Sequence, residues 1–139
     1  MYLIDTNVIS ELRKKAKANV GVQEFFKNAA SNNADLYLPS IVIGELRRGV
    51  ELLKYRSDFE QAKQLEKWLS KLLKVYSEKI IDFDSDAAQV WGRLLTPNNQ
   101  NAINKQLAAI SIVHGLCVVT RNVMHFEGTG AEVLNPFLN

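Results

Sequence analysis

The sequence predicts an α/β protein with a mainly parallel central sheet of about five short strands covered by helices. Short apolar runs alternate with longer amphipathic segments along the whole chain, the order that gives parallel sheets. The runs are apolar at successive positions, as in strands buried on both faces. The 139 residues contain no linker or repeat, and their apolar fraction of 47% is ordinary. We therefore expect one domain spanning residues 1–139.

Composition excludes several classes of protein. No apolar run approaches the ~18 residues that cross a bilayer, and no targeting segment is present at the start. The single cysteine, Cys117, cannot form an internal disulfide, which agrees with a reducing compartment. We therefore expect a cytoplasmic protein without membrane contact. The net charge of +2 is compatible with a nucleic-acid partner but does not require one.

The first strand ends in an acid. Leu3 and Ile4 suit a buried strand, and Asp5, Thr6 and Asn7 follow before a helical pattern begins. Ligands of open α/β sheets bind at the carboxyl ends of strands, so Asp5 is placed for chemistry. Capping of the next helix by one of these three polar residues is the structural alternative.

After a second amphipathic helix, Leu36–Leu38 predicts the second strand, and Ser40 is expected to cap the helix that follows Pro39. Glu45 borders the apolar face of this helix. A buried carboxylate needs a partner, so either a metal ion or an ion pair with Arg47 or Arg48 is expected there.

Ser57–Glu60 resembles a capping box that opens a long helix. Its apolar stripe comprises Ala62, Leu65, Trp68 or Leu69, Leu72 and Tyr76. Together with the preceding helix it predicts a protruding helical hairpin. The apolar faces of these two helices are wider than contact with one sheet requires. They therefore have two interpretations, ordinary core packing or a surface that binds a partner protein or a second copy of the chain.

The remaining strands are expected at Ile80–Phe83, Leu116–Thr120 and Glu132–Leu134. Asp82, Asp84 and Asp86 are close enough in sequence to suggest a metal site, but helix capping explains them better. A helix from Ile103 to His114, ended by Gly115, is apolar nearly all round and hence buried, with Asn104 in its first turn.

Right-handed crossovers would bring the ends of the first and fourth strands to one crevice. Five polar residues from distant segments converge there: Asp5, Glu45, Asn104, Thr120 and Asn122. Oxygen ligands without His or Cys suit Mg²⁺ or Mn²⁺. Such ions promote phosphodiester cleavage by activating a water and neutralising charge.

Five segments, in the right order and spread over essentially the whole chain, resemble PIN-domain ribonucleases. They resemble most the VapC toxins of bacterial type II toxin–antitoxin systems, including the FitB-like subgroup. The segments are Leu3–Glu11, Ile43–Gly49, Gln106–Ile110, Val119–Asn122 and Phe126–Pro136.

The resemblance implies a PIN-like fold and a Mg²⁺-dependent endoribonuclease that cuts tRNA or rRNA until a VapB-type antitoxin blocks it. It also implies a homodimer, with operator DNA bound only through the antitoxin. Asp5 and Glu45 would be catalytic metal ligands, with Thr120 near the metal and Thr6 and Asn7 in support. For contact with RNA or antitoxin, the expected residues are Arg13, Arg47, Arg48 and Arg121.

Asn104 departs from the family, which has an aspartate at this ligand position. An amide oxygen can coordinate Mg²⁺ but brings no charge, so we expect greatly reduced cleavage. Asn104 is then an engineered inactivating change, which we favour, or a natural weakening. A catalytically silent PIN-like module that binds RNA or protein is the alternative function. Asn122 replaces an acid of only some relatives, and His125 stands where an acid is common and receives no role.

Overall fold

The computed structural model describes all residues 1–139, and its five strands form one sheet in the order β3-β2-β1-β4-β5. Every neighbouring pair is parallel, which confirms the predicted class. β1 lies in the middle, where Leu3 is in register with Tyr37 on one side and Val118 on the other. The strands are β1 (Tyr2–Ile4), β2 (Leu36–Pro39), β3 (Ile80–Ile81), β4 (Cys117–Val119) and β5 (Glu132–Leu134).

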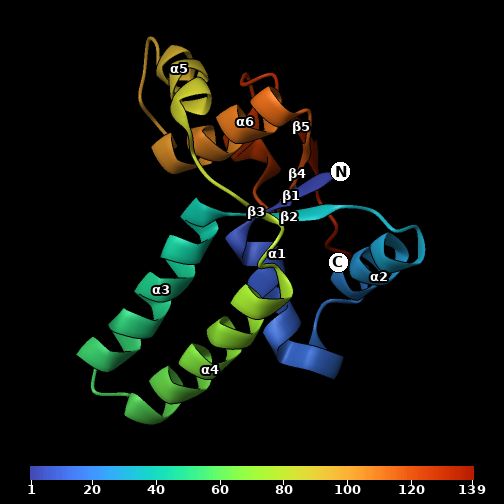
Figure 1. Cartoon of the computed structure of the whole chain (residues 1–139), viewed down its shortest axis with the longest axis vertical. Coiled ribbons are helices and arrows are strands. Elements are labelled where there is room, and N and C mark those ends of the chain that lie inside the picture. Colours follow the sequence, from blue (N-terminus) through green and yellow to red (C-terminus); the bar gives the residue numbers. More distant parts are fainter.

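Helices fill the connections between the strands. They are α1 (Thr6–Glu11), α2 (Val20–Ser31), α3 (Ser40–Tyr55), α4 (Phe59–Val75), α5 (Ser85–Leu94) and α6 (Ala102–His114), with the 3₁₀ segments η1 (Leu12–Lys17) and η2 (Val123–Phe126). The predicted hairpin is confirmed, since α3 and α4 run side by side away from the sheet, opposite α5 and α6 (Figure 1). None of the helices combines the length and apolar character needed to span a bilayer.

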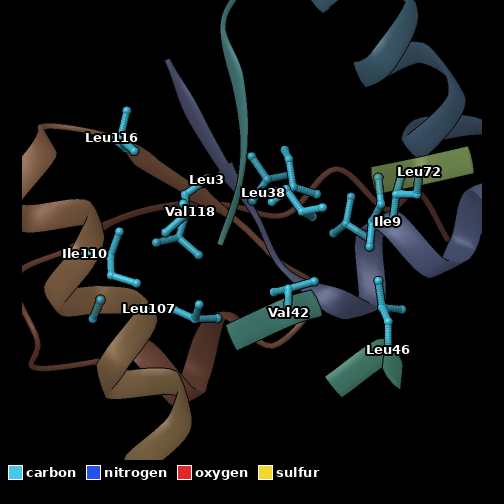
Figure 2. Packing of buried hydrophobic residues seen from close by; sticks show 14 of the residues in the cluster. Leu3, Ile9, Leu38, Val42, Leu46, Leu72, Leu107, Ile110, Leu116 and Val118 are labelled. Carbon is cyan, nitrogen blue, oxygen red and sulfur yellow. The ribbon is translucent and has the colours of Figure 1, made fainter. Parts of the chain in front are cut away.

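The core surrounds the two central strands. Leu3 and Val118 are completely buried, as expected for strands covered on both faces. Leu107 and Ile110 of α6 pack beside Val118, and Leu38 lies close to Leu3 (Figure 2). This packing fixes the carboxyl ends of β1 and β4 next to each other.

Two helix starts differ from the sequence prediction. Ser40 is not a cap: Pro39 remains extended because it pairs with Ile81, and Ser40 is already the first helical residue. Asp58, not Ser57, caps α4 by accepting a hydrogen bond from Gln61 N at 3.3 Å. Ser57 closes the preceding turn with a left-handed backbone (φ 63°), which leaves Asp58 as the last non-helical residue.

The acids before α5 serve as predicted. Asp84 Oδ1 accepts a hydrogen bond of 2.9 Å from Ala87 N, so Asp84 is a helix cap. No metal-binding group of acidic, histidine or cysteine side chains forms around it. The hydrogen bond from Ala87 N confirms the capping interpretation for Asp84, and Asp86 lies in the first turn of α5, where a carboxylate suits the helix dipole.

The α3–α4 hairpin is joined by a buried apolar seam and a surface ion pair. Leu46 and Leu69 are buried in the seam, and Trp68 is only partly covered, so Leu69 is the core residue of its turn. Both terminal guanidinium nitrogens of Arg47 donate to the carboxylate of Glu66, at 2.8 and 2.7 Å. Core packing thus accounts for most of the predicted apolar stripe.

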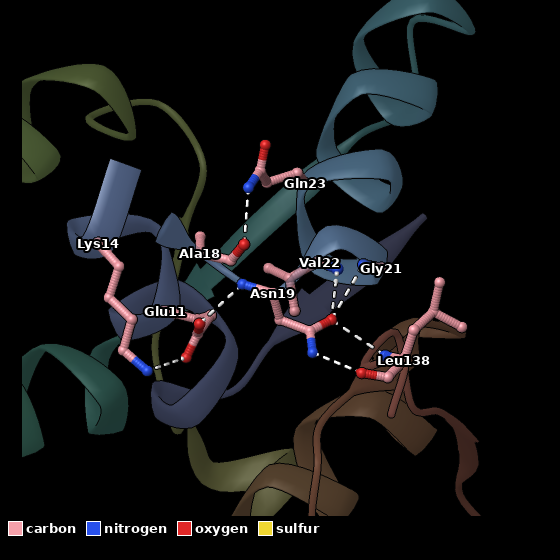
Figure 3. A network of polar contacts seen from close by, with 8 residues as sticks. All are labelled: Glu11, Lys14, Ala18, Asn19, Gly21, Val22, Gln23 and Leu138. Atoms are coloured by element: carbon pink, nitrogen blue, oxygen red, sulfur yellow. Dashed lines mark hydrogen bonds and ion pairs between the residues drawn. The ribbon is translucent and has the colours of Figure 1, made fainter. Parts of the chain in front are cut away.

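A polar network ties the C-terminal segment to the start of α2 (Figure 3). Asn19 caps α2 through Gly21 N, accepts a hydrogen bond from Leu138 N at 3.0 Å and donates one to Leu138 O at 2.6 Å. Its own backbone N–H donates to Glu11, which also pairs with Lys14 at 2.9 Å. The end of the chain is therefore anchored to the segment that joins η1 and α2.

Candidate active site

A cleft of about 410 Å³ opens at the carboxyl ends of the central strands. Its walls come from the start of α1, the second turn of α3, the first turn of α6 and the loop after β4. The lining residues are Asp5, Thr6, Asn7, Glu45, Ile103, Asn104, Asn122 and His125. The structure thus brings together six of the predicted site residues, and we call this hollow the acidic cleft.

A larger hollow of about 560 Å³ lies at the opposite, amino ends of the strands. It is lined mainly by apolar side chains, and Glu132 is its only carboxylate. Since catalytic sites need several convergent polar groups, the acidic cleft is the better candidate.

Asp5 lies at the base of the acidic cleft, with only 5% of its surface exposed. Burial raises the pKa of its carboxyl group, whereas hydrogen bonds from Thr120 and from the backbone of Thr6 act in the opposite direction. Thr6 N donates to Oδ1 at 2.7 Å, so Asp5 is also the cap of α1. No lysine or arginine forms an ion pair with it, and this buried charge is left for a cation to neutralise.

Glu45 is held by a threonine and not by an arginine. Thr6 Oγ1 donates a hydrogen bond of 2.7 Å to Glu45 Oε1. The ion pair considered from the sequence is wrong, because Arg47 pairs with Glu51 and Glu66 and Arg48 forms no ion pair. One threonine thus links α1 to α3 and contacts both acids of the cleft.

Thr120 is completely buried beneath Asp5 and donates a hydrogen bond of 2.8 Å to its Oδ2. The same hydroxyl oxygen accepts a hydrogen bond of 3.0 Å from Asn122 N. Asn7 Oδ1 accepts one of 3.0 Å from Arg121 N, which ties the loop after β4 to α1. The residues after β4 therefore orient the acid that ends β1.

Asn104 and His125 meet at the rim of the acidic cleft. Asn104 Nδ2 lies 3.2 Å from His125 Nδ1. No role was predicted for His125, since the short 3₁₀ segment η2 that carries it has no periodic pattern in the sequence. The only sign in the sequence that His125 belongs to the site was that the proteins this chain resembles commonly have an acid at this position. This contact leaves the Asn104 carbonyl oxygen free for another partner.

The model of the PIN domain matches residues 2–128. The chain belongs to the PIN-domain family. It is 31% identical to the VapC ribonuclease Y4jK of Sinorhizobium fredii, over 99% of this chain and 98% of that protein. It is 28% identical to the toxin FitB of Neisseria gonorrhoeae, over 99% of both. The crystal structure of FitAcB from Neisseria gonorrhoeae superposes with a TM-score of 0.84, at 29% identity and covering 98% of each chain.

The donor set of this PIN domain fits a hard divalent cation. Asp5 and Glu45 offer carboxylate oxygens and Asn104 an amide oxygen, all of which Mg²⁺ accepts. The structure contains no group of three or more His, Cys, Asp or Glu that could hold a metal. The set therefore fits in ligand type but provides only two negative charges.

None of the four predicted arginines lines the acidic cleft. Arg47 is engaged by Glu66, and the guanidinium of Arg121 stacks on the Phe137 ring, 4.7 Å from its centroid. Arg48 is exposed on α3, and Arg13 lines a different hollow on the PIN domain. Phosphate contact inside the acidic cleft is thus left to other groups.

Proposed function

We propose that this PIN domain is the toxin of a VapBC-type toxin–antitoxin system and hydrolyses RNA phosphodiester bonds with a divalent metal. The observation that carries the proposal is the buried, unpaired carboxylate of Asp5 beside Glu45 and Asn104. The relatives named a VapC ribonuclease and a toxin support the same function.

The cation, Mg²⁺ or Mn²⁺, would be held by Asp5, Glu45 and Asn104. When bound, it supplies charge neutralisation for the phosphodiester and activation of a water nucleophile. The remaining work belongs to the chain. Thr120 and the Thr6 backbone stabilise Asp5 in its charged form, and the Thr6 hydroxyl fixes Glu45.

Asn104 weakens this site. An amide at the third ligand position lowers the negative charge that attracts the cation, and metal affinity depends on that charge. An aspartate at the same position would lie beside His125, which now contacts Asn104 at 3.2 Å. We therefore expect the chain as it stands to cut RNA poorly.

The proposal includes a partner. A VapB-type antitoxin would cover the acidic cleft, and the likeness to the toxin FitB supports an antitoxin as the partner. We also propose that the chain forms a homodimer and that its substrate is tRNA or rRNA. Operator DNA would be bound only through the antitoxin.

The test compares the chain with Asn104 as it stands with Asn104→Asp, using Asn99→Asp as a control that adds the same charge in the polar loop outside the cleft. Mg²⁺ binding is measured by calorimetry and cleavage on total cellular RNA. We expect at least about tenfold tighter binding and new RNA cleavage for Asn104→Asp alone, because only that change adds a charged ligand. If Asn104→Asp matches the control in both measurements, the nuclease proposal fails.

Asn104 also favours a second candidate, a module that binds RNA or protein without cutting it. This candidate predicts that the natural chain binds RNA and that Asn104→Asp gains no cleavage. The same samples, assayed for RNA binding by filter retention, separate the two functions.

A further inference from the structure

A second cleft, of about 370 Å³, lies between η1 and α4. It is lined by Arg13, Lys15, Gln64, Lys67, Trp68 and Lys71. We call it the basic cleft, because it contains four cationic side chains and no acid. It shares no lining residue with the acidic cleft.

The charges of the basic cleft are not neutralised within the protein. All four cationic residues are exposed, and none forms a salt bridge. Their neighbours behave differently: Lys14 pairs with Glu11, and Arg47 pairs with Glu66. In a chain with a net charge of only +2, this is a local concentration of positive charge that attracts an anionic partner.

The spacing on α4 gathers these groups on one face. Gln64, Lys67, Trp68 and Lys71 follow the i, i+3, i+4, i+7 pattern of a single helix face. Lys67 and Lys71 are like charges four residues apart, an arrangement that destabilises a helix. A bound polyanion would relieve this repulsion.

Trp68 indicates which polyanion fits. Its side chain is partly exposed in the basic cleft, with the Arg13 guanidinium 5.6 Å from the ring centroid. Cations that follow a phosphate backbone, together with an aromatic ring on which a base stacks, are the combination that binds single-stranded nucleic acid. An acidic protein segment would use the cations but would gain nothing specific from the ring.

The basic cleft and the acidic cleft are separated by one short helical stretch of the chain. Asp5 caps α1, and Arg13 follows it by eight positions, six in α1 and two at the start of η1. At 1.5 Å per residue in an α-helix and about 2.0 Å in a 3₁₀ helix, this corresponds to about 13 Å along the helix axis, a length that a few nucleotides span. A strand of a few nucleotides in the acidic cleft is therefore long enough to extend to Arg13.

We propose that the basic cleft binds single-stranded RNA on one side of the cleavage position, with phosphates on Lys67, Lys71 and Arg13 and a base on Trp68. This inference rests on the proposed function, in which RNA is the substrate. It makes the η1–α4 surface a determinant of how tightly single-stranded RNA is bound.

The first test measures binding of a fluorescein-labelled oligouridylate in EDTA by fluorescence anisotropy over a range of salt concentrations. Lys67→Ala/Lys71→Ala is compared with Lys27→Ala/Lys74→Ala, a control that removes two exposed lysines outside the cleft. We expect weaker binding for the first pair only. The slope of log K against log salt concentration should fall by about 1.4, since each single-strand phosphate contact contributes about 0.7.

The second test uses Trp68→Leu, with circular dichroism as a check on folding. The oligouridylate should quench tryptophan fluorescence in the natural chain but not in the variant, and affinity should fall at least about fivefold. If Trp68→Leu does not fold, oligouridylate binding by Lys67→Ala/Lys71→Ala alone tests the inference.

Three results would overturn the inference: a natural chain that does not bind the oligonucleotide, a lysine pair that matches its control, or displacement of RNA by polyglutamate with no effect of a folded Trp68→Leu. The last result would assign the basic cleft to an acidic protein segment.

Cleavage of RNA by Asn104→Asp tests the proposed function separately from the basic cleft. If Asn104→Asp cuts RNA but Lys67→Ala/Lys71→Ala binds the oligonucleotide normally, only the inference about the basic cleft fails. If Asn104→Asp does not cut RNA but Lys67→Ala/Lys71→Ala binds the oligonucleotide weakly, only the nuclease proposal fails.

Discussion

Thr120 donates a hydrogen bond of 2.8 Å to Asp5 Oδ2 and so joins two residues 115 positions apart. Oδ1 of the same carboxylate accepts the backbone N–H of Thr6. Asp5 is thus held from two sides, by a side-chain hydroxyl and by a backbone N–H. The orientation of the central acid depends on the packing of β4 against β1.

Thr120→Val should destabilise the protein by about 1–3 kcal/mol, since it leaves the buried Asp5 without its hydroxyl donor and Asn122 N without its acceptor. Urea unfolding without metal measures this loss. Thr120→Ser keeps the hydroxyl and should lose much less. Equal stability of the two variants would show that the hydroxyl is unimportant.

Asp5→Asn should raise stability at neutral pH in the absence of metal. Burial raises the pKa of Asp5, so the folded state binds a proton more tightly than the unfolded chain does. The stability that this acid contributes is present at low pH and is lost as pH rises through the raised pKa. Thermal unfolding in EDTA should therefore show the stability of Asp5→Asn gaining on that of the chain with Asp5 as the pH rises above about 4, the usual pKa of an aspartate. A chain with Asp5 that is the more stable of the two at pH 7 would contradict this.

Gly21→Ala should detach the C-terminal segment. A Cβ at Gly21 would meet Pro136 O and the Leu138 side chain at 2.2 and 2.7 Å, well inside van der Waals contact. We expect faster proteolysis of residues 135–139 and a lower unfolding temperature. Gly92→Ala is the matched control: nothing lies within 4 Å of its Cβ, and alanine should stabilise α5 by about 0.5–1 kcal/mol.

The α3–α4 hairpin should depend on its apolar seam more than on its ion pair. Leu69→Ala removes a side chain that is 1% exposed and should cost about 2–5 kcal/mol. Glu66→Gln breaks an exposed pair and should cost far less, with a difference that shrinks further in high salt. Urea unfolding at two salt concentrations compares them, and similar losses would refute the expectation.

The fold was largely predictable because its signals are local. The apolar runs around Leu3 and Val118 predict buried parallel strands, and the acid after the first run predicts the crevice to which Glu45 and Asn104 also contribute. β3 was predicted too long, since only Ile80 and Ile81 pair with β2.

The detailed contacts of the site were less predictable, because they depend on how helices are rotated against each other. Nothing in the sequence near Glu45 indicates that its partner is Thr6, 39 positions earlier, and not an adjacent arginine. His125 was assigned no role for the same reason, since the short 3₁₀ segment η2 carries it to Asn104. The helical spacing left either Trp68 or Leu69 as the core residue of this turn of α4, and only the structure places Leu69 inside.

The position of β1 in the sheet has a consequence for synthesis. The middle strand is made first, and β4, one of its two neighbours, is among the last segments to be made. Until β4 emerges from the ribosome, one edge of β1 has no partner and Asp5 lacks Thr120, so a nascent chain carries no assembled cleft. Pairing over such a separation is slow. The acidic cleft is therefore completed only at the end of synthesis, when β4 joins β1.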